Sequence, residues 1–263
     1  MINNGDIIAD MHTHTTFSEH AYSSVKENIE IAKKRHRKYL AVTDHYYGNG
    51  DDISRKNEVC RIRYMEERIN SLEKDISIIS GAEFNIGQEV YRWDILRKMK
   101  WRPIGLHSWF IDIPNTTLDE LYHKFCESVD KHNCFVHIER ELHKIEQGKF
   151  KESLYGKDLL PSDIKLWLEA ICIEAKKKDI FLEVNESSLI TNDGNAAQRL
   201  EYWLEYAKQN GNMISLGSDA HYCLEVGKFS NVLKLLNKID YPKELILNCN
   251  EEMILGLKGL APM

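Results

Sequence analysis

Histidine and carboxylate side chains recur in this sequence at the ends of short apolar runs, where they could bind metal ions. Seven of the eleven histidines follow such a run or lie in the loop after the first run, and two acids take equivalent places; the set is His12, His14, His20, His45, Glu83, His107, His137, Asp219 and His221. Imidazole with carboxylate suits zinc, iron or manganese, whereas softer sites use thiolate. Nine candidate ligands are too many for one ion, so we expect two or three divalent ions with Glu83 as a bridge.

A group of metal ions points to hydrolytic chemistry. Multi-metal sites generate hydroxide at neutral pH and stabilise the oxygens of a transferring phosphoryl group. The alternative for any single histidine is an ordinary hydrogen-bonded residue at a strand end. A solvated surface does not explain why seven of eleven histidines collect at these positions. We therefore interpret them jointly as a functional site.

The apolar runs that carry these residues have the composition of strands buried on both faces. They are continuous and rich in Ile, Val and Leu, as strands of parallel sheets are, and they span residues 6–12, 39–45, 76–84, 102–108, 133–139, 180–187 and 213–221. Between the runs, amphipathic patterns predict helices near 23–38, 59–72, 117–129, 162–178, 195–210 and 225–238. Ser24 with Glu27, and Thr117 with Glu120, have the spacing of helix capping boxes.

Strand followed by helix, seven times over, predicts an α/β fold with parallel strands and right-handed crossovers. Seven units favour a closed (β/α)7 barrel over an open sheet, and because no linker divides the chain we expect one domain over residues 1–263. The carboxyl ends of barrel strands meet at one face, where active sites are built. His12 and His14 are two residues apart on a strand and should point to the same side; the same holds for Asp219 and His221 if their strand continues that far.

Composition narrows the class of protein. The net charge of −6 argues against general nucleic-acid binding. No apolar run approaches the roughly 20 residues of a membrane span. The six cysteines form no C-x-x-C pair, and the first residues show neither a basic start nor an apolar signal segment. These features predict a reduced, cytoplasmic protein without a membrane or nucleic-acid partner, and nothing in them indicates an oligomeric state.

Six short motifs resemble those of the polymerase and histidinol phosphatase (PHP) superfamily: "DMHTHTTFSEHAYS", "VTDH", "GAEF", "GLHS", "FVHIER" and "GSDAH". The "SEHAYS" loop is similar to that of the subgroup that holds three metal ions. The resemblance implies a distorted (β/α)7 barrel with its metal site at the C-terminal face. It also implies the ligand sets: His12, His14, Glu83 and Asp219 for the first ion; Glu83, His107 and His137 for the second; His20, His45 and His221 for the third.

The resemblance further implies a phosphatase that acts on a small phosphorylated metabolite. A metal-bridging hydroxide would attack phosphorus, with Glu83, Asp219 and Arg140 as catalytic residues. Histidinol phosphate, an intermediate of histidine biosynthesis, is the leading substrate. Because "HIER" is similar to a stretch of relatives that act on phosphotyrosine, phosphotyrosine or another phosphoester is the alternative. A metal-dependent amidohydrolase or deaminase, and a non-enzymatic metal-binding domain, are further alternatives.

Two residues are candidates for contact with the substrate. Arg140 could clamp phosphate, because Arg pairs with phosphate in a bidentate way; it could equally pair with a neighbouring Glu. Asn185 could bond the substrate or simply satisfy a loop. Asp44 and Asp219 could each be the general acid, and Asp44 could instead orient a histidine. Loops at 46–57 and 139–161 are expected to set substrate choice.

Overall fold

The computed structural model describes residues 1–46, 64–86, 99–105, 117–129, 133–137, 161–191 and 194–259. Its strands are β1 (Ala9–Asp10), β2 (Tyr39–Val42), β3 (Ser77–Ser80), β4 (Phe84–Asn85), β5 (Arg102–Gly105), β6 (Asn133–Val136), β7 (Phe181–Asn185) and β8 (Ile214–Gly217). Its helices are α1 (Val25–Lys34), α4 (Leu118–Ser128), α6 (Pro161–Lys177), α7 (Glu186–Thr191), α8 (Gly194–Asn210), α9 (Ser230–Lys238) and α10 (Glu251–Gly259), with a further helical stretch over 64–72.

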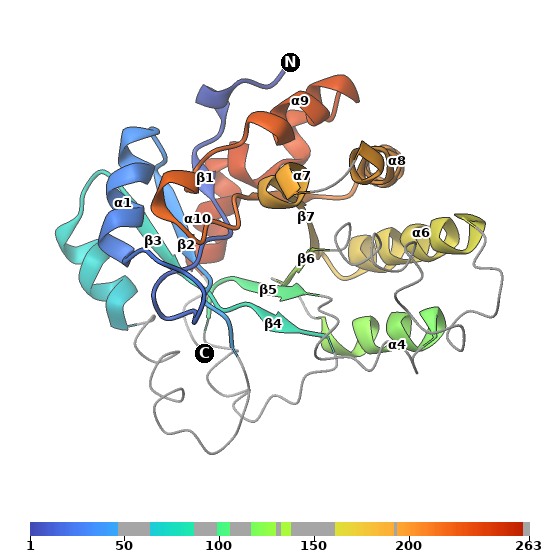
Figure 1. Cartoon of the computed structure of the whole chain (residues 1–263), viewed down its shortest axis with the longest axis horizontal. Helices are drawn as coiled ribbons and strands as arrows, with labels where there is room; N and C mark the ends of the chain where they lie inside the picture. Colours follow the sequence, from blue (N-terminus) through green and yellow to red (C-terminus); the bar gives the residue numbers. More distant parts are fainter. Residues whose placement is uncertain are drawn as a thin grey trace.

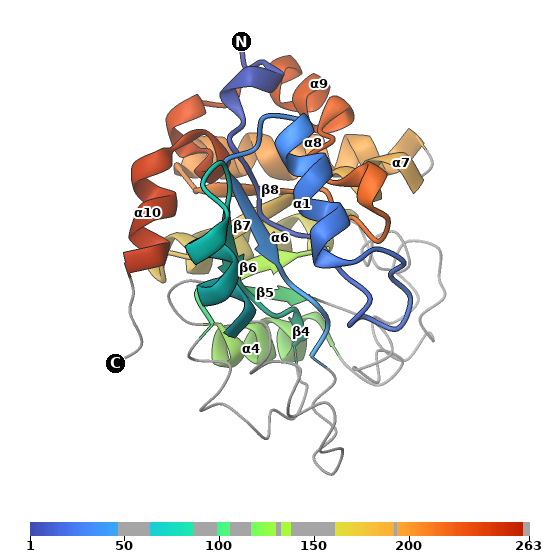
Figure 2. The same cartoon turned by 90° about the vertical axis from the view of Figure 1, so that its left-hand side faces the viewer.

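Two parallel sheets hold all the named strands. One has the order β1-β2-β3 and the other the order β4-β5-β6-β7-β8, and every pairing within them is parallel. The strands lie in the middle of the molecule, with α1, α4, α6 and α8 on the outside (Figures 1 and 2). This is the arrangement expected where helices form the crossovers between parallel strands.

Isolated bridges join the two sheets into a ring. At the first junction Thr13, just beyond β1, pairs in parallel with Ala220, just beyond β8. Backbone hydrogen bonds support this junction, because the amide of Met11 donates to the carbonyl of Leu216 at 3.2 Å. The first and last strands of the chain therefore lie side by side, as a closed barrel requires.

The second junction lies where β3 ends and β4 begins. Gly81 pairs in parallel with Trp101 ahead of β5, and His45 beyond β2 pairs with Glu83. A Cβ atom at Gly81 would lie 2.8 Å from both the Trp101 carbonyl oxygen and Thr43 Cγ2, so only glycine permits this approach. β3 and β4 thus occupy one strand position, and the ring is a distorted (β/α)7 barrel, as predicted.

Hydrophobic residues alternate between the inside of the ring and the helices around it. On β6, Phe135 packs in the cluster that contains Phe125 of α4 and Ile171 of α6, whereas Cys134 and Val136 belong to the other cluster, with Trp101. On β7, Leu182 and Val184 belong to the helix-facing cluster. The period of two therefore turns Glu183 and Asn185 to the inside, at the carboxyl end of the strand.

Both predicted capping boxes are present. The Ser24 side chain accepts from the amide of Glu27, and the Glu27 carboxylate accepts from the amide of Ser24, so α1 begins where the sequence indicates. Thr117 and Glu120 do the same for α4. Among the described residues, no helix combines the length and the apolar character that a membrane crossing requires. The single domain over 1–263 stays a prediction.

Candidate metal centre

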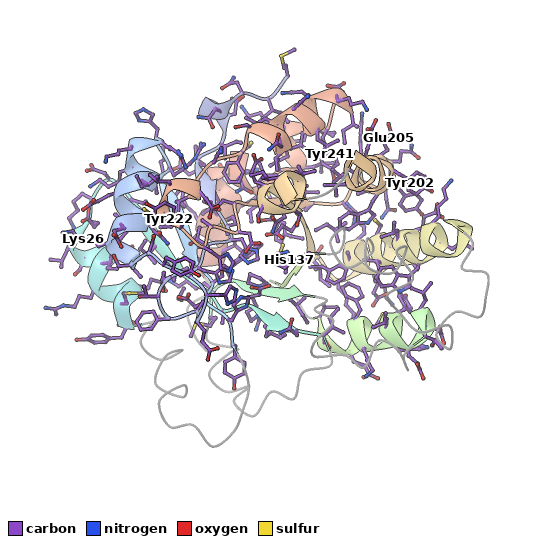
Figure 3. All side chains as sticks on the ribbon, in the orientation of Figure 1. Lys26, His137, Tyr202, Glu205, Tyr222 and Tyr241 are labelled. Carbon is purple, nitrogen blue, oxygen red and sulfur yellow. The ribbon has the colours of Figure 1, made fainter. Side chains whose placement is uncertain are left out.

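The structure brings the predicted ligands together at the carboxyl ends of the strands. His12 and His14 follow β1, His45 follows β2, and Glu83 lies between β3 and β4. His137 directly follows β6, inside the ring of helices (Figure 3). Asp219 and His221 follow β8, and His20 reaches in from the loop after the first strand. Two predicted site residues, His107 and Arg140, lie outside the described residues.

Four of these side chains turn one nitrogen or oxygen atom toward a common centre. His12 Nε2 lies 3.1 Å from His14 Nε2, and both nitrogens lie 3.4 Å from Glu83 Oε2. Asp219 Oδ1 lies 3.3 Å from His14 Nε2 and 3.7 Å from His12 Nε2. Ligands bound to one zinc ion at about 2.0–2.1 Å in a tetrahedron lie roughly 3.3 Å apart. The atoms of His12, His14 and Asp219 therefore have the spacing of a single ion's ligands, and Glu83 Oε2 lies beside the two imidazoles.

Glu83 faces a second group with its other oxygen. Its Oε1 lies 3.2 Å from His137 Nε2, while Oε2 faces His12 and His14. Asp219 Oδ2 lies 3.9 Å from the same His137 nitrogen. One fully buried carboxylate is thus shared by two sets of imidazoles, which is the geometry that a bridging carboxylate between two ions requires.

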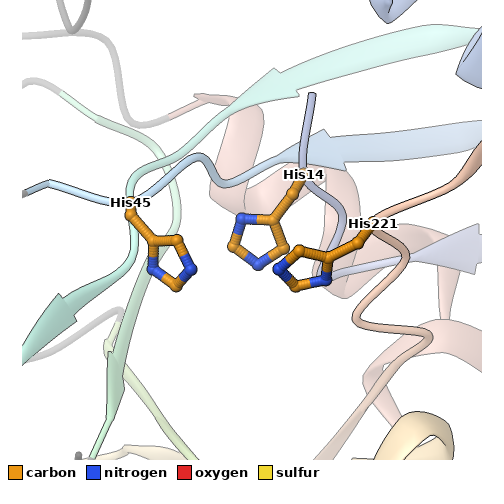
Figure 4. Close-up of side chains that lie close together, drawn as sticks. All are labelled: His14, His45 and His221. Atoms are coloured by element: carbon orange, nitrogen blue, oxygen red, sulfur yellow. The ribbon is translucent and has the colours of Figure 1, made fainter. Parts of the chain in front are cut away.

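A third group consists of stacked histidine rings. The ring of His14 lies 4.4 Å from those of His45 and His221, centre to centre (Figure 4). His20 Nε2 lies 3.3 Å from His45 Nε2, and its ring lies 4.5 Å from that of His221. Among the described residues, His221 Nε2 is buried with no hydrogen-bond partner. A buried nitrogen of this kind is costly unless it binds something, so the donor set fits a further ion.

Two of these residues have backbone conformations that non-glycine residues rarely adopt. His137 has φ of 60° and Asp219 has φ of 54°. This left-handed region disfavours side chains with a Cβ atom, and such strain is concentrated at functional sites. β8 ends at Gly217, so Asp219 and His221 do not continue the strand. The turned backbone nevertheless brings His221 Nδ1 to 3.6 Å from Asp219 Oδ1.

Most of this chain matches a known protein family. The profile of the PHP domain matches residues 10–218. This chain belongs to the PHP domain family. The match begins two residues before His12 and ends one residue before Asp219, so the PHP domain contains most of the metal centre described above.

Known relatives of this PHP protein span most of its length. A protein of Caldanaerobacter subterraneus subsp. tengcongensis named "Probable phosphatase" is 27% identical, over 94% of this chain and 89% of its own. The "Probable phosphatase YcdX" of Escherichia coli is 28% identical, over 97% of this chain and 96% of its own. Among solved structures, a crystal structure of histidinol phosphate phosphatase from Lactococcus lactis is complexed with zinc, L-histidinol and phosphate. It has a TM-score of 0.59 and 18% sequence identity to this chain, and the match covers 89% of this chain and 94% of that one. That likeness shows the shared fold.

The charges of the PHP site are strongly coupled. Burial penalises the charged form of Asp219, but His137 and His14 outweigh it and hold the pKa of this carboxyl well below its usual range. Burial also opposes the charge on His137, yet Asp219 and Glu83 raise the pKa of its imidazole to about 9. Burial, followed by the charge of His45, holds the pKa of His14 well below the ordinary value. The carboxyl of Asp219 is thus stabilised in its charged form, which is the form that binds cations.

Asp44 forms hydrogen bonds with residues that lie next to the metal centre. Its Oδ1 accepts hydrogen bonds from the Thr15 amide and from Ser18 Oγ, both at 2.7 Å, and its Oδ2 accepts from Thr15 Oγ1 at 2.7 Å. Ser18 Oγ in turn lies 3.1 Å from His14 Nδ1. Of the two roles considered for Asp44, these contacts favour the orientation of a histidine over proton donation to a substrate.

Asn185 is fully buried beside the centre. Its Nδ2 donates to Glu183 Oε2 at 3.0 Å and lies 3.4 Å from His137 Nδ1, while its Oδ1 accepts from the Ser188 amide at 3.0 Å. Its contact with a substrate stays a prediction. The sixth apolar run of the sequence ends in Glu183 and Asn185, residue types that can bind metal ions, but we predicted no role for Glu183 in the site. Its place two residues before Asn185 on one strand was the signal for such a role.

Proposed function

We propose that this PHP protein is a metal-dependent phosphatase that releases phosphate from a small phosphomonoester, with histidinol phosphate the leading substrate. The phosphatase names of its relatives support the reaction class. The ligands of the structural neighbour, L-histidinol and phosphate with zinc, support histidinol phosphate as the first substrate to test.

The observation that carries the proposal is the position of Glu83. A single buried carboxylate directs one oxygen at His12 and His14 and the other at His137. A pair of ions that shares a carboxylate can hold both the attacking and the leaving oxygen of an in-line displacement at phosphorus. We infer that the residues which hold the ions are His12, His14, Glu83 and Asp219 for the first, Glu83, His107 and His137 for the second, and His20, His45 and His221 for the third.

Each part of the site has a role in this reaction. When bound, two or three divalent ions (zinc, iron or manganese) supply a nucleophilic water at neutral pH and neutralise charge on the phosphoryl oxygens. The buried carboxylates Glu83 and Asp219 fix the positions of those ions. We assign Arg140 to the phosphate group, because a guanidinium can pair with two of its oxygens.

The test is phosphate release by the metal-loaded protein. Histidinol phosphate, phosphotyrosine and p-nitrophenyl phosphate are assayed in parallel, after elemental analysis of the metal content. We expect histidinol phosphate to have the highest kcat/KM of the three. A higher kcat/KM with phosphotyrosine would make phosphotyrosine the proposed substrate in place of histidinol phosphate. The reaction class, hydrolysis of a phosphomonoester, would stay the same.

Two outcomes would overturn the reaction class itself. One is a fully metal-loaded protein that releases no phosphate from any of the three esters. The other is release of ammonia from nucleobases without phosphate release, which would indicate a deaminase. The matched control is the same protein after treatment with a chelator, which should release no phosphate.

A further inference from the structure

Glu183 is a second buried carboxylate that contacts the metal centre, on the side of His12 away from Glu83. Its Oε1 lies 2.6 Å from His12 Nδ1, and its side chain is 2% exposed. The other ring nitrogen of His12, Nε2, lies near His14 and Glu83. The imidazole of His12 is therefore held between two carboxylates, one at each nitrogen.

The short distance identifies the contact as a hydrogen bond and not as a shared ion. Separate ligands of one ion at about 2.0–2.2 Å lie roughly 3 Å or more apart, so 2.6 Å matches a hydrogen bond better than two ligands of one ion. A bond from a ring N–H to a carboxylate is charge-assisted and stronger than a neutral one. It requires the proton on Nδ1, which leaves the lone pair of Nε2 free to bind a metal.

The carboxylate of Glu183 is itself held in place. Asn185 Nδ2 donates to its second oxygen at 3.0 Å, and Asn185 Oδ1 accepts from the amide of Ser188 at the start of α7. Gly217 of β8 lies directly against the contact. A Cβ atom there would be 2.2 Å from Glu183 Oε1 and 2.5 Å from His12 Cβ, so the pair can meet only because residue 217 has no side chain.

We propose that Glu183 is a positioning residue of the metal centre: it fixes the tautomer and the ring orientation of His12 so that Nε2 faces the first ion. Through Asn185, which also lies 3.4 Å from His137 Nδ1, the same carboxylate is linked to a histidine of the second group. The inference rests on the proposed function in one respect, because it takes His12 to be a metal ligand.

The test compares two substitutions at Glu183 with one elsewhere. Glu183→Gln keeps the size of the side chain and a neutral acceptor, whereas Glu183→Ala removes the acceptor. The matched control is Glu174→Gln, at a buried carboxylate on α6 that contacts Lys177 and Lys178. Affinity of the metal-free proteins for Zn²⁺ alone is measured by competition with a chromophoric chelator. The proton on His12 is located by nitrogen-15 NMR of the zinc-loaded proteins.

We expect Glu183→Gln to bind the first zinc ion about 10-fold more weakly and Glu183→Ala about 100-fold more weakly than the wild type, the range typical of outer-shell partners. Glu174→Gln should be unchanged. A role in packing alone would leave Glu183→Gln equal to the wild type and would overturn the proposal. So would a spectrum of the zinc-loaded wild type that shows the His12 proton on Nε2.

If neither Glu183 variant folds, Gly217→Ala supplies a second test, because a Cβ atom there displaces the contact between Glu183 and His12 and should also weaken zinc binding at least 10-fold. An unchanged affinity in Gly217→Ala would overturn the proposal. The outcomes separate the two claims. A wild type that binds zinc and releases no phosphate contradicts the proposed function alone, whereas an active phosphatase whose Glu183 variants retain full zinc affinity contradicts this inference alone.

Discussion

Among single residues, Glu83 contacts imidazoles of both proposed ion groups with its two oxygens. Its two oxygens lie within 3.4 Å of His12, His14, His45 and His137. We predict that Glu83→Gln loses at least one bound ion and more than about 100-fold of phosphatase activity, because loss of an outer-shell partner alone costs 10–100-fold. Elemental analysis and phosphate release measure the two effects.

The control for this variant is Glu66→Gln. Glu66 is also a buried acid, but it bonds Ser80 and Lys100. It should keep the full metal content and activity. A Glu83→Gln protein that retains both would contradict the assignment of Glu83 as the bridge.

A second residue-scale prediction concerns the number of ions. His20 is an exposed histidine whose ring stacks on those of His45 and His221. We expect His20→Gln to lose one equivalent of metal and to retain the others, because the first two groups do not include this ring. His123→Gln, at an exposed histidine of α4, is the matched control. Equal metal content in the two variants, by elemental analysis, would exclude a third ion held by His20.

Sequence alone located the residues that face the centre and one candidate supporting residue, Asp44, but not the other residues that support them. His12, His45 and Asp219 were predictable because each follows an apolar run, and strand ends of a barrel meet at one face. Glu183 and Ser18 act through a hydrogen bond to another residue, and such partners are defined by distance in space. The spacing of residues along the sequence therefore could not reveal that Glu183 and His12 lie 2.6 Å apart.

At the scale of elements, the break between β3 and β4 depends on Gly81. A Cβ atom at this position would lie 2.8 Å from a backbone oxygen, which cannot move without a shift of the Trp101 strand end. We predict that Gly81→Ala lowers the free energy of unfolding by about 1–3 kcal/mol, as overpacking does. Urea-induced unfolding of the metal-free protein measures the change.

Gly256→Ala is the matched substitution. Nothing lies within 4 Å of a Cβ atom at Gly256, in helix α10. Alanine is favoured over glycine in a helix, so this variant should gain about 0.5–1 kcal/mol. Equal stability changes at the two positions would show that the β3–β4 junction tolerates a side chain.

Most elements were predictable from periodicity, and the exceptions have physical reasons. The run 76–84 reads as one strand, but the close approach of Trp101 at Gly81 divides it into β3 and β4. α7 was missed because its six residues directly follow β7 and are too few for a helical period to show. α10 follows α9, which is the helix of the last strand–helix unit, so the alternation of strands and helices gives no expectation for it.

At the scale of the whole molecule, one side chain joins the first and last strands of the ring. Asn248 is fully buried; its Nδ2 donates to the carbonyls of Ala9 and Leu216, and its Oδ1 accepts from the Leu216 amide at 2.7 Å. We predict that Asn248→Ala lowers the free energy of unfolding by at least about 2 kcal/mol, because it leaves buried backbone groups without partners. Thermal unfolding of the variant beside Asn250→Ala, a half-buried neighbour, checks this.

Removal of the ions should affect the stability of the entire chain. Ions that bind only the folded protein stabilise it by about 2.7 kcal/mol at 100 times their dissociation constant. We predict that a chelator lowers the Tm by about 5–10 °C, a few degrees for each kcal/mol, and that added zinc or manganese restores it. An unchanged Tm in calorimetry, with full loss of metal, would show that the centre does not contribute to folding stability.

The junction of β1 with β8 has a consequence for biosynthesis. The first ion's proposed ligands come from both His12 and Asp219, so a nascent polypeptide cannot assemble that centre until residue 219 has left the ribosome. The early imidazoles must remain without their partners through most of translation. We therefore expect this first site to be completed late, and premature termination anywhere before Asp219 removes one of its four proposed ligands.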